Sequence, residues 1–429
     1  MPNFKKIYQD LLPVILALYI YLGKGIAYSY LAEMFWIVGL ILIIIERRNI
    51  NIIMNTRSVL LIIFLLLNIL YIIRGLFHYS ILDVIRDSFI FNYLLFSFII
   101  FLYYDNYSLI IDKILKIYRY YPLVISILYL LSLNSFIGNI TIFGQNHLLF
   151  FKFGDILVHL FISLIFLLCG YYKQTKIQYL FFIGSVVFLF FIGSSYSRGG
   201  MVSFLLALFL FFLSNKDLKI KMNLSIFFRY LLLSLIIIIP IIFVLPKDEN
   251  FQGRKTGLDQ ISTNVTSIIS DEEQGSLSDN KIWRLLWWAK IIDYTFGGEY
   301  FINGKGLGMS LAQDDDIVFE SNEAELRSPH NFHLSILARY GVPIFCCWIF
   351  WLFLSFRRLV YKNLSTFKLV LITLQIAFIF NASFDVFLEG PMGAFPFWIF
   401  IGLDLLSDSI NLDQYLPNNE LNILNAKAD

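Results

Sequence analysis

The stretch SIFFRYLLLSLIIIIPIIFVL, residues 225–245, is followed almost at once by a polar stretch of more than eighty residues, 247–330. The apolar stretch is long enough to cross a hydrocarbon core about 30 Å thick as a helix. The polar stretch has its own tryptophans, glycines and charges, and a new apolar run begins directly after it. The sequence therefore predicts a membrane protein with one long extramembrane loop.

The composition indicates a helical protein with many membrane spans. Of the 429 residues, 58% are hydrophobic and 15% are charged, against roughly 25% charged residues in a soluble domain. The apolar runs are continuous, whereas the strands of a transmembrane barrel alternate polar and apolar residues. The predicted fold class is therefore all-α and polytopic. The net charge of +2 gives no sign of nucleic acid binding, and the three cysteines lack metal-site or disulfide spacing.

Twelve apolar runs predict twelve transmembrane helices. Their expected bounds are 8–23, 28–45, 58–76, 84–104, 111–133, 155–172, 177–195, 199–214, 225–246, 331–356, 365–387 and 392–407. Nine precede the long loop and three follow it. The predicted regions are an N-terminal membrane domain (1–246), the long loop (247–330), and C-terminal helices with a tail (331–429).

The short loops predict the orientation, because cytoplasmic loops of membrane proteins are enriched in Lys and Arg. With the N-terminus inside, six cytoplasmic segments hold 18 of the 33 basic residues. The opposite short loops hold only Lys24, Lys152 and Arg198. Both termini are therefore expected in the cytoplasm, and the long loop is expected outside.

The long loop has a charge and helix pattern of its own. It contains 15 Asp or Glu and 8 Lys or Arg, a net charge of −7. Its stretch DNKIWRLLWWAKIIDY, residues 279–294, has apolar residues at helical spacing. The three tryptophans of this stretch favour a helix at the membrane interface, where indole rings settle at headgroup depth. Gly304, Gly306 and Gly308 then predict a plain turn, since the P-loop ending of Lys-Ser/Thr is missing.

Two residues at the outer side could carry chemistry. Arg198 stands in a Ser-Arg-Gly-Gly turn, and its planar guanidinium suits a phosphate or diphosphate. The alternative for Arg198 is an arginine that reaches the lipid headgroups. His330 stands where the long loop re-enters the membrane, and histidine is the usual general base near neutral pH. For His330 the alternative is a hydrogen-bonded interfacial side chain, and His333 nearby does not complete a metal site.

Further candidates depend on their neighbours. Arg254 and Arg284 of the long loop can contribute to a cationic pocket beside His330, although each alone is typical of a solvated surface charge. Asp385 and Glu389 are four residues apart near the end of the eleventh predicted span, so they can share a helix face and pair with the arginines. Asn331 is a secondary candidate because it follows His330 directly.

The order of these motifs resembles the O-antigen ligase and polymerase superfamily of bacterial membrane glycosyltransferases. The motifs are the Ser-Arg-Gly turn at Arg198, the Arg-x-x-x-Trp segment at Arg284, the Gly-x-Gly turn, and His-Asn-x-x-Leu at His330. They cover about residues 190–345. The sequence departs from the family where it reads Gly341-Val342-Pro343, and the surroundings of Arg254 match little.

The resemblance implies a GT-C-like helical fold and glycosyl transfer without a metal or other cofactor. The implied donor is a sugar chain on undecaprenyl diphosphate. Arg198, Arg284 and Arg254 would hold the diphosphate, and His330 would activate the acceptor hydroxyl. The implied place is the bacterial inner membrane, with the site facing the periplasm. The partners would be the glycan donor, a glycan acceptor, membrane lipids and a chain-length regulator protein.

Three functions remain open at this stage. A polymerase joins lipid-linked repeat units, whereas a ligase moves the finished chain to the lipid A core. The composition, rich in Phe and Ile, favours the polymerase. A flippase for the same lipid-linked sugar is a third candidate, but the notable charges cluster on one face and no internal repeat is found.

Overall fold

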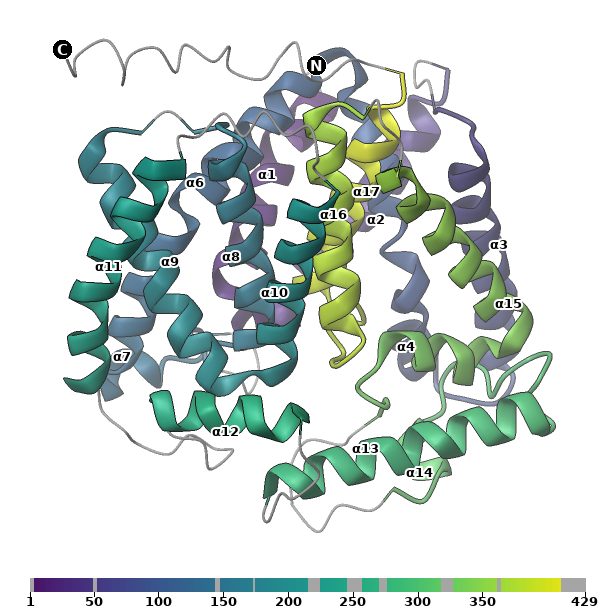
Figure 1. Cartoon of the computed structure of the whole chain (residues 1–429). Helices are drawn as coiled ribbons and strands as arrows, with labels where there is room; N and C mark the ends of the chain where they lie inside the picture. The colour runs from purple at the N-terminus through teal and green to yellow at the C-terminus, as the bar shows by residue number, and fades with distance from the viewer. Residues whose placement is uncertain are drawn as a thin grey trace.

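A computed structural model describes residues 4–48, 52–142, 147–172, 174–214, 224–244, 257–269, 276–317, 327–360 and 364–409. Within these ranges the chain is helical, and its only β-type pairing is an isolated bridge between Thr141 and His147. Figure 1 shows long helices side by side, with α12 (Leu258–Ile269) and α13 (Ser276–Ile292) lying across one end. The predicted all-α fold is confirmed.

The upright helices follow the predicted spans. They are α1 (Phe4–Leu22), α2 (Leu31–Ile45), α3 (Thr56–Leu76), α4 (Ile81–Asn92), α6 (Tyr107–Ser132), α8 (Phe153–Leu168), α9 (Lys176–Tyr196), α10 (Arg198–Leu213), α11 (Leu224–Val244), α15 (Phe332–Phe356), α16 (Thr366–Ala382) and α17 (Pro391–Leu406). The predicted span 84–104 is broken. There α4 ends at Asn92, and the chain continues through α5 (Leu95–Ile99) and a 3-10 helix, η2 (Ile100–Asn106).

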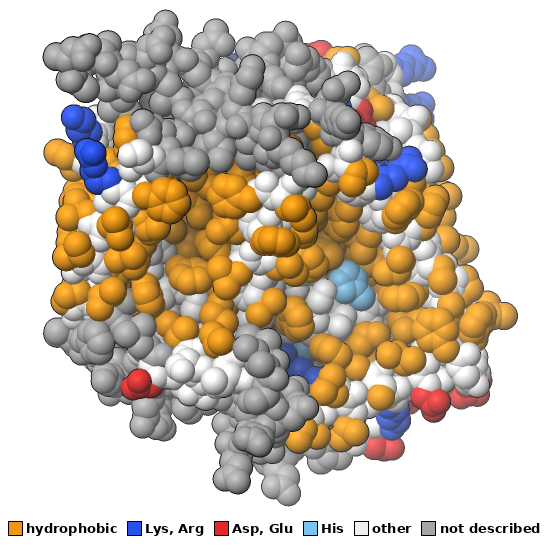
Figure 2. All heavy atoms as spheres, viewed as in Figure 1, with side chains coloured by type: hydrophobic (Ala, Val, Ile, Leu, Met, Phe, Trp, Pro, Cys, Tyr) orange, Lys and Arg blue, Asp and Glu red, His pale blue; other side chains and the backbone are white. Residues whose placement is uncertain are grey.

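Several helical segments have the length and composition to cross a membrane. Five qualify fully: Phe4–Ser29, Thr56–Leu76, Leu95–Ser132, Lys176–Tyr196 and Phe332–Val360. Six other apolar helices in the described parts of the chain are 10–17 residues long. Figure 2 shows hydrophobic side chains over the middle of one face and charged side chains mainly towards its two ends. The chain is therefore a multi-pass membrane protein, while the count of twelve spans stays a prediction.

A single residue, Ser197, separates α9 from α10. Its backbone leaves the helical region, and its hydroxyl accepts a hydrogen bond from the Gly200 backbone N–H, which caps α10. The sequence at this turn thus ends one helix and starts the next within a residue. Arg198 is consequently the first residue of α10, where the positive end of the helix dipole lies.

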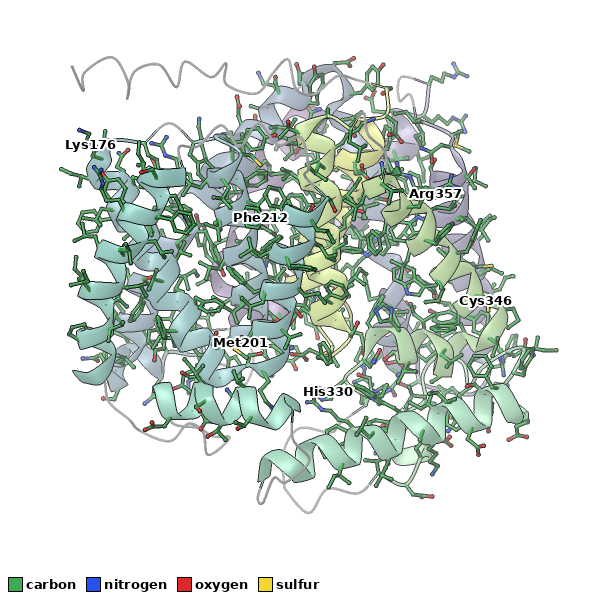
Figure 3. The ribbon with its side chains drawn as sticks, viewed as in Figure 1. Lys176, Met201, Phe212, His330, Cys346 and Arg357 are labelled. Carbon is green, nitrogen blue, oxygen red and sulfur yellow. The ribbon has the colours of Figure 1, made fainter. Side chains whose placement is uncertain are left out.

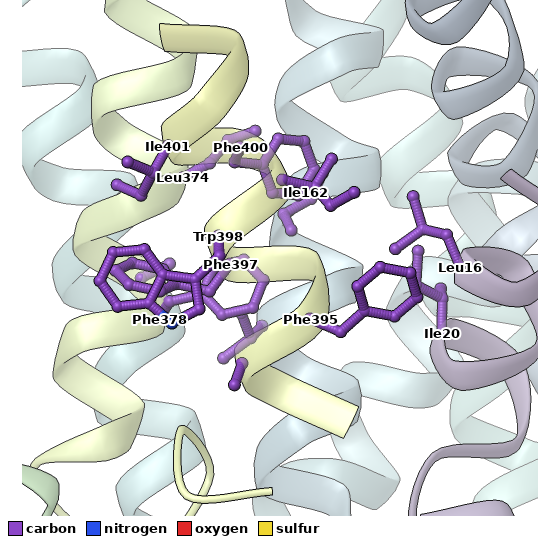
Figure 4. Close-up of a cluster of buried hydrophobic side chains, with 14 of the residues drawn as sticks. Leu16, Ile20, Ile162, Leu374, Phe378, Phe395, Phe397, Trp398, Phe400 and Ile401 are labelled. Atoms are coloured by element: carbon purple, nitrogen blue, oxygen red, sulfur yellow. The ribbon is translucent and has the colours of Figure 1, made fainter. Parts of the chain in front are cut away.

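Helix α17 forms the centre of the bundle, and its residues are buried along their whole length. Figure 4 shows its Phe395, Phe397, Trp398, Phe400 and Ile401 among apolar side chains of α1, α8 and α16. In a bilayer such contacts stabilise through close van der Waals packing, because lipid tails are as apolar as these side chains. This core fixes the loop 383–390 before α17, which carries part of the candidate site.

The end of the bundle opposite α13 is fastened by buried ion pairs. Arg57 of α3 contacts Asp404 at 2.6 Å and Asp408 at 2.7 Å, while Arg358 also contacts Asp404. The Asp404 side chain is fully buried, so its charge requires these partners. The cluster joins α3 to the ends of α15 and α17.

Residues 276–317 form a packed lid over the first half of α15. Trp287 and Ile291 of α13 are fully buried against Leu311 and Leu337. The Trp287 Nε1 donates to Asp315 Oδ2 at 2.7 Å. The predicted helix is confirmed, and the placement of its tryptophans at headgroup depth stays a prediction, but Trp287 points into the lid. A partner within the lid satisfies its indole N–H, and the sequence periodicity does not show such a partner.

The glycine turn of the lid docks where α15 breaks. The Lys305 N–H donates to the Ala338 carbonyl at 2.8 Å, and the Val342 N–H donates to the Phe301 carbonyl at 2.8 Å. Between these contacts Gly341 has φ +79° and ψ 178°, so it interrupts the helix. In Figure 1 the first part of α15 lies along the end of the bundle and the second part runs upright. The single straight span expected for 331–356 is therefore corrected to two helices joined at Gly341.

Candidate active site

His330 lies just before α15, at the end of the bundle covered by α12 and α13 (Figure 3). Its φ of 52° is uncommon outside glycine. Two tryptophans of α13 hold it: the Trp288 Nε1 donates to the carbonyl of Pro329 at 2.8 Å, and the Trp283 ring lies edge-on at 6.0 Å. The strained step and its supports keep the imidazole at a defined place, with 26% of the side chain exposed.

Asp385 faces His330 from the loop between α16 and α17. Its Oδ1 lies 3.7 Å from His330 Nδ1 and 2.7 Å from Lys152 Nζ. Burial would raise the pKa of Asp385, but the Lys152 charge and the contact with His330 lower it well below its usual range. Asp385 is therefore a carboxylate at neutral pH, and it can orient the imidazole and stabilise its protonated form.

Lys152, which immediately precedes α8, is a site residue that the sequence prediction missed. Burial would lower the pKa of Lys152, but Asp155 and Asp385 outweigh this and raise it. The lysine is thus a fixed positive charge beside the Asp385–His330 pair. A signal was present in the sequence, because Lys152 is one of the three basic residues in the outer short loops.

Arg284 of α13 is held in place but retains an unused donor. Its Nη1 donates to the Phe384 carbonyl at 3.1 Å, whereas its Nε is buried with no hydrogen-bond partner among the described residues. Burial lowers the pKa of the Arg284 guanidinium; the Asp385 carboxylate opposes this shift and the Arg198 charge adds to it. A buried N–H without a partner beside a second arginine favours an anionic ligand.

Arg198 comes close to this group because glycines allow tight packing. A Cβ on Gly199 would lie 2.9 Å from Phe384 Cβ, and one on Gly200 would lie 2.7 Å from the Cα of Gly154. Side chains at these positions would push α10 away from α8 and from the 383–390 loop. The glycine pair after Arg198 therefore brings three segments together at the site.

The secondary candidates have positioning roles. The Asn331 side chain caps α15 by accepting hydrogen bonds from the backbone N–H groups of His333 and Leu334. Glu389 accepts a hydrogen bond from Ser335 at 2.6 Å. Asn331 and Glu389 thus hold α15 and the 383–390 loop, and only Asp385 of the three secondary candidates faces His330. Arg254 lies outside the described residues.

His333 does not extend the site. Its Nδ1 accepts from Trp348 Nε1 at 3.0 Å, and its Nε2 lies 3.1 Å from the Ser383 hydroxyl. Both ring nitrogens are thus used in packing α15. In the described part of the chain, no three His, Cys, Asp or Glu side chains are placed to hold a metal ion.

The arrangement combines two kinds of chemistry. His330 with Asp385 can accept a proton from a bound hydroxyl. Arg284, with Arg198 close by, can hold an anion and stabilise negative charge that develops on it. In Figure 2 a small group of Lys or Arg and His side chains lies among hydrophobic ones near α13. Together these groups suit the transfer of a group from an anionic carrier to a hydroxyl.

Comparison with known proteins agrees with this chemistry. Residues 183–349 match the family model described as O-antigen ligase. No curated protein matches the chain significantly. The matched range contains Arg198, Arg284 and His330, whereas Lys152 and Asp385 lie outside it. Residues 183–349 of this multi-pass membrane protein are thus similar to the O-antigen ligase family, and the match supports its placement in the O-antigen ligase and polymerase superfamily.

Proposed function

We propose that this protein is a membrane glycosyltransferase that moves a glycan from undecaprenyl diphosphate to a sugar hydroxyl. The observation that carries the proposal is the meeting of His330, Asp385 and Arg284 at one end of the bundle. These residues come from three segments that lie far apart in the sequence. A chain that only packed into a membrane would not require a histidine–carboxylate pair beside an arginine whose buried Nε–H is unused.

In the proposed step, His330 acts as the general base. Its Nδ1 faces Asp385, so Nε2 is the nitrogen that takes the proton from the acceptor hydroxyl. The hydroxyl oxygen forms a bond to the anomeric carbon as the bond from that carbon to the phosphate oxygen breaks. The electron pair of the broken bond leaves with undecaprenyl diphosphate. General base catalysis of this kind contributes on the order of 10²–10⁴-fold.

The arginines serve the leaving group. Arg284 and Arg198 are proposed to bind the diphosphate, and Arg254 is a predicted third ligand. Guanidinium groups bind phosphate oxygens in a forked geometry and keep their charge at all working pH values. They supply the positive charge that a metal would otherwise supply, so the proposed transfer is independent of metals and other cofactors.

The proposed setting is the bacterial inner membrane. The charge distribution of the short loops supports cytoplasmic termini and a site at the periplasmic face. The bundle would then be a GT-C-like fold with twelve spans, divided into membrane helices 1–246, the periplasmic loop 247–330 and the C-terminal region 331–429. Membrane lipids surround it, and a chain-length regulator protein is a proposed partner.

Within this activity we propose a polymerase, whose acceptor is a second lipid-linked repeat unit. The composition rich in Phe and Ile supports it. The alternative is a ligase, whose acceptor is the lipid A core. Both enzymes need the same donor site, so the choice depends on the acceptor.

Deletion of the protein in its own host tests the proposal. Lipopolysaccharide from the deletion strain is compared on a gel with that of strains that carry the wild type, His330→Ala or Arg198→Ala. The proposal expects both variants to accumulate in the membrane and to reproduce the deletion pattern. Normal surface polysaccharide in both variants would contradict the site.

The lipopolysaccharide pattern of the deletion strain distinguishes a polymerase from a ligase. Core carrying a single repeat unit indicates a polymerase, and bare core indicates a ligase. Lipid-linked units that accumulate on the cytoplasmic side would instead indicate a flippase, and the transferase proposal would then be wrong.

A further inference from the structure

One carboxylate of α4, that of Asp87, contacts three segments around His330. Its Oδ2 lies 2.9 Å from Arg339 Nη1 and accepts a hydrogen bond from the Gly308 backbone N–H at 3.0 Å. Arg327 Nη2 lies 3.4 Å from the same oxygen. Only 6% of the Asp87 side chain is exposed. Asp87 therefore joins α4 to the glycine turn of the lid, to the residues that lead into α15, and to α15 itself.

The two arginines stand on either side of His330 along the chain. Arg327 precedes His330 by three residues, and Arg339 follows it by nine, in the first part of α15. A single carboxylate thus holds both ends of the segment 327–339, here called the His330 segment. The φ of 52° at His330 is uncommon, and such a conformation persists only where the surrounding structure imposes it.

Asp87 can serve as a fixed point because α4 is held by a buried hydrogen-bond network. The Asn68 side chain of α3 donates to the Ser88 carbonyl at 2.9 Å and to Asn92 Oδ1 at 2.9 Å. The Tyr340 hydroxyl of α15 donates to Asn68 Oδ1 at 2.6 Å. Asn68, Ser88 and Tyr340 are fully buried. Supporting contacts of this kind hold a site within the narrow limits that catalysis needs.

The arginines are directed by more than one contact. Arg339 Nη1 also donates to the Met309 carbonyl at 3.1 Å, and Arg327 also lies 3.5 Å from Asp83, whose side chain is more exposed. The Arg339 side chain is 4% exposed, and Asp87 is its only carboxylate partner in the described parts of the chain. Apolar residues of similar volume often stabilise a fold as well as a buried ion pair does. Stability alone therefore does not explain this arrangement, whereas the positioning of the His330 segment does.

We propose that Asp87 is a positioning residue that holds the His330 segment at both ends, so that the imidazole meets the acceptor hydroxyl. The inference rests on the proposed glycosyl transfer, and it adds a residue that acts through His330 without touching the substrate. A misplacement of about 1 Å in a reacting group can cost on the order of 100-fold in rate. Loss of the contacts with Asp87 should therefore lower kcat.

The test is a double-mutant cycle with the full-length protein in lipid nanodiscs. Arg327→Met frees one end of the His330 segment and leaves the buried Asp87–Arg339 pair in place. Asp87→Asn removes the charge that both arginines share. Each change is made in the wild type and in His330→Ala. The substrate is the lipid-diphosphate-linked repeat unit isolated from the host strain, and kcat per folded molecule and KM are measured. Arg47→Met, at an exposed position, is the control.

In the wild-type background Arg327→Met is expected to lower kcat about tenfold or more, and Asp87→Asn at least as much. The KM should stay within about twofold, because Arg198 and Arg284, the proposed donor ligands, belong to α10 and α13. In His330→Ala each change should lower the residual rate less than about twofold, since no imidazole is left to position. The control should keep kcat within about twofold.

The conservative variant Arg327→Lys keeps the charge at Asp87 and should restore most of the kcat that Arg327→Met loses. If Asp87→Asn does not fold, Arg327→Met decides alone. Unchanged kcat in folded Arg327→Met would overturn the inference. Equal losses in the wild-type and His330→Ala backgrounds, or failure of Arg327→Met to fold, would mean that the contacts serve only the fold, and would also overturn it. Absence of transfer by the wild type would instead overturn the proposed function itself.

Discussion

Two residues support His330: Asp385, which the sequence indicates, and Lys152, which it does not. His330 is a candidate because of the motif around it, and Asp385 is a candidate because it lies near the end of a predicted span. Lys152 has no motif, and its role follows from its 2.7 Å contact with Asp385. That contact joins residues more than two hundred positions apart, so no local pattern could predict it.

Lys152→Met is expected to move the acidic limb of the pH–rate profile to higher pH. The Asp385 pKa is lowered in the protein mainly by Lys152, against the opposing effect of burial. Without the lysine the Asp385 pKa rises, so the carboxylate is protonated at a higher pH and supports His330 less. The profile of transfer rate against pH, measured on the purified variant, checks this.

The direction of the stability effect follows from the same shift. A carboxylate with a lowered pKa contributes stability above its unfolded pKa of about 3.9, and this contribution is lost as the pH falls through the lowered value.

Lys152→Arg keeps the charge and should keep the acidic limb near that of the wild type. An identical pH profile for Lys152→Met and the wild type would contradict the coupling.

Arg284→Lys separates charge from geometry at the proposed diphosphate site. Lysine keeps the positive charge but has no planar fork and no donor at the Nε position, which is buried without a partner in the described chain. The KM for the lipid-linked donor is expected to rise about tenfold or more, from the loss of a charge-assisted hydrogen bond. The exposed Arg47→Lys in the same assay is the control. Equal donor KM values for Arg284→Lys and the wild type would argue against a phosphate contact.

The break in α15 is the element that fits the lid to the bundle. The sequence contains Gly341 and Pro343, yet the apolar pattern continues through both and predicts one span. The break depends on the backbone contacts with Phe301 and Lys305, which belong to the lid. Likewise, helical periodicity predicted α13, but the direction of its indole groups is set by Asp315 and Pro329. Partners across the fold, rather than local preference, decide both features.

Gly341→Ala is expected to destabilise the protein by about 1–3 kcal/mol, because its backbone conformation is nearly exclusive to glycine. A Cβ there would also lie 2.6 Å from the Ile302 carbonyl oxygen. Gly184→Ala in α9 is the control, since its Cβ would meet only Ser234 Oγ at 3.8 Å. Thermal unfolding in detergent should show a lower midpoint for Gly341→Ala alone. Equal unfolding midpoints for both variants would show that the break in α15 does not require glycine at position 341.

The fold of the whole molecule was largely predictable because apolar runs reveal membrane helices directly. The helix positions agree with the predicted spans, apart from the broken segment 84–104, the break in α15 and the end of the span 365–387. There α16 stops at Ala382, so Asp385 and Glu389 lie in a turn and the helix face predicted for them is wrong. The ion cluster of Arg57, Asp404 and Asp408 was not predicted, because the sequence does not show which charges at the ends of different helices pair with one another. This cluster lies at the end of the bundle away from His330, so we expect it to support the fold without taking part in the proposed chemistry.

Arg57→Met is expected to cost about 3–5 kcal/mol of stability, because it leaves the buried Asp404 short of a partner. Chemical unfolding in detergent measures the loss. Lys368→Met, which removes a half-exposed partner of Asp408, is the milder control. Transfer activity per folded molecule should stay unchanged in both variants. A selective loss of activity in folded Arg57→Met would contradict the expectation that the ion cluster does not affect the chemistry at the other end of the bundle.

The most direct test of the account measures the release of undecaprenyl diphosphate by the purified protein supplied with lipid-linked repeat units. The account predicts one new glycosidic bond for each undecaprenyl diphosphate released by the wild type. In folded His330→Ala the rate should fall on the order of 10²–10⁴-fold. Release at the wild-type rate by folded His330→Ala would contradict His330 as the base that activates the acceptor.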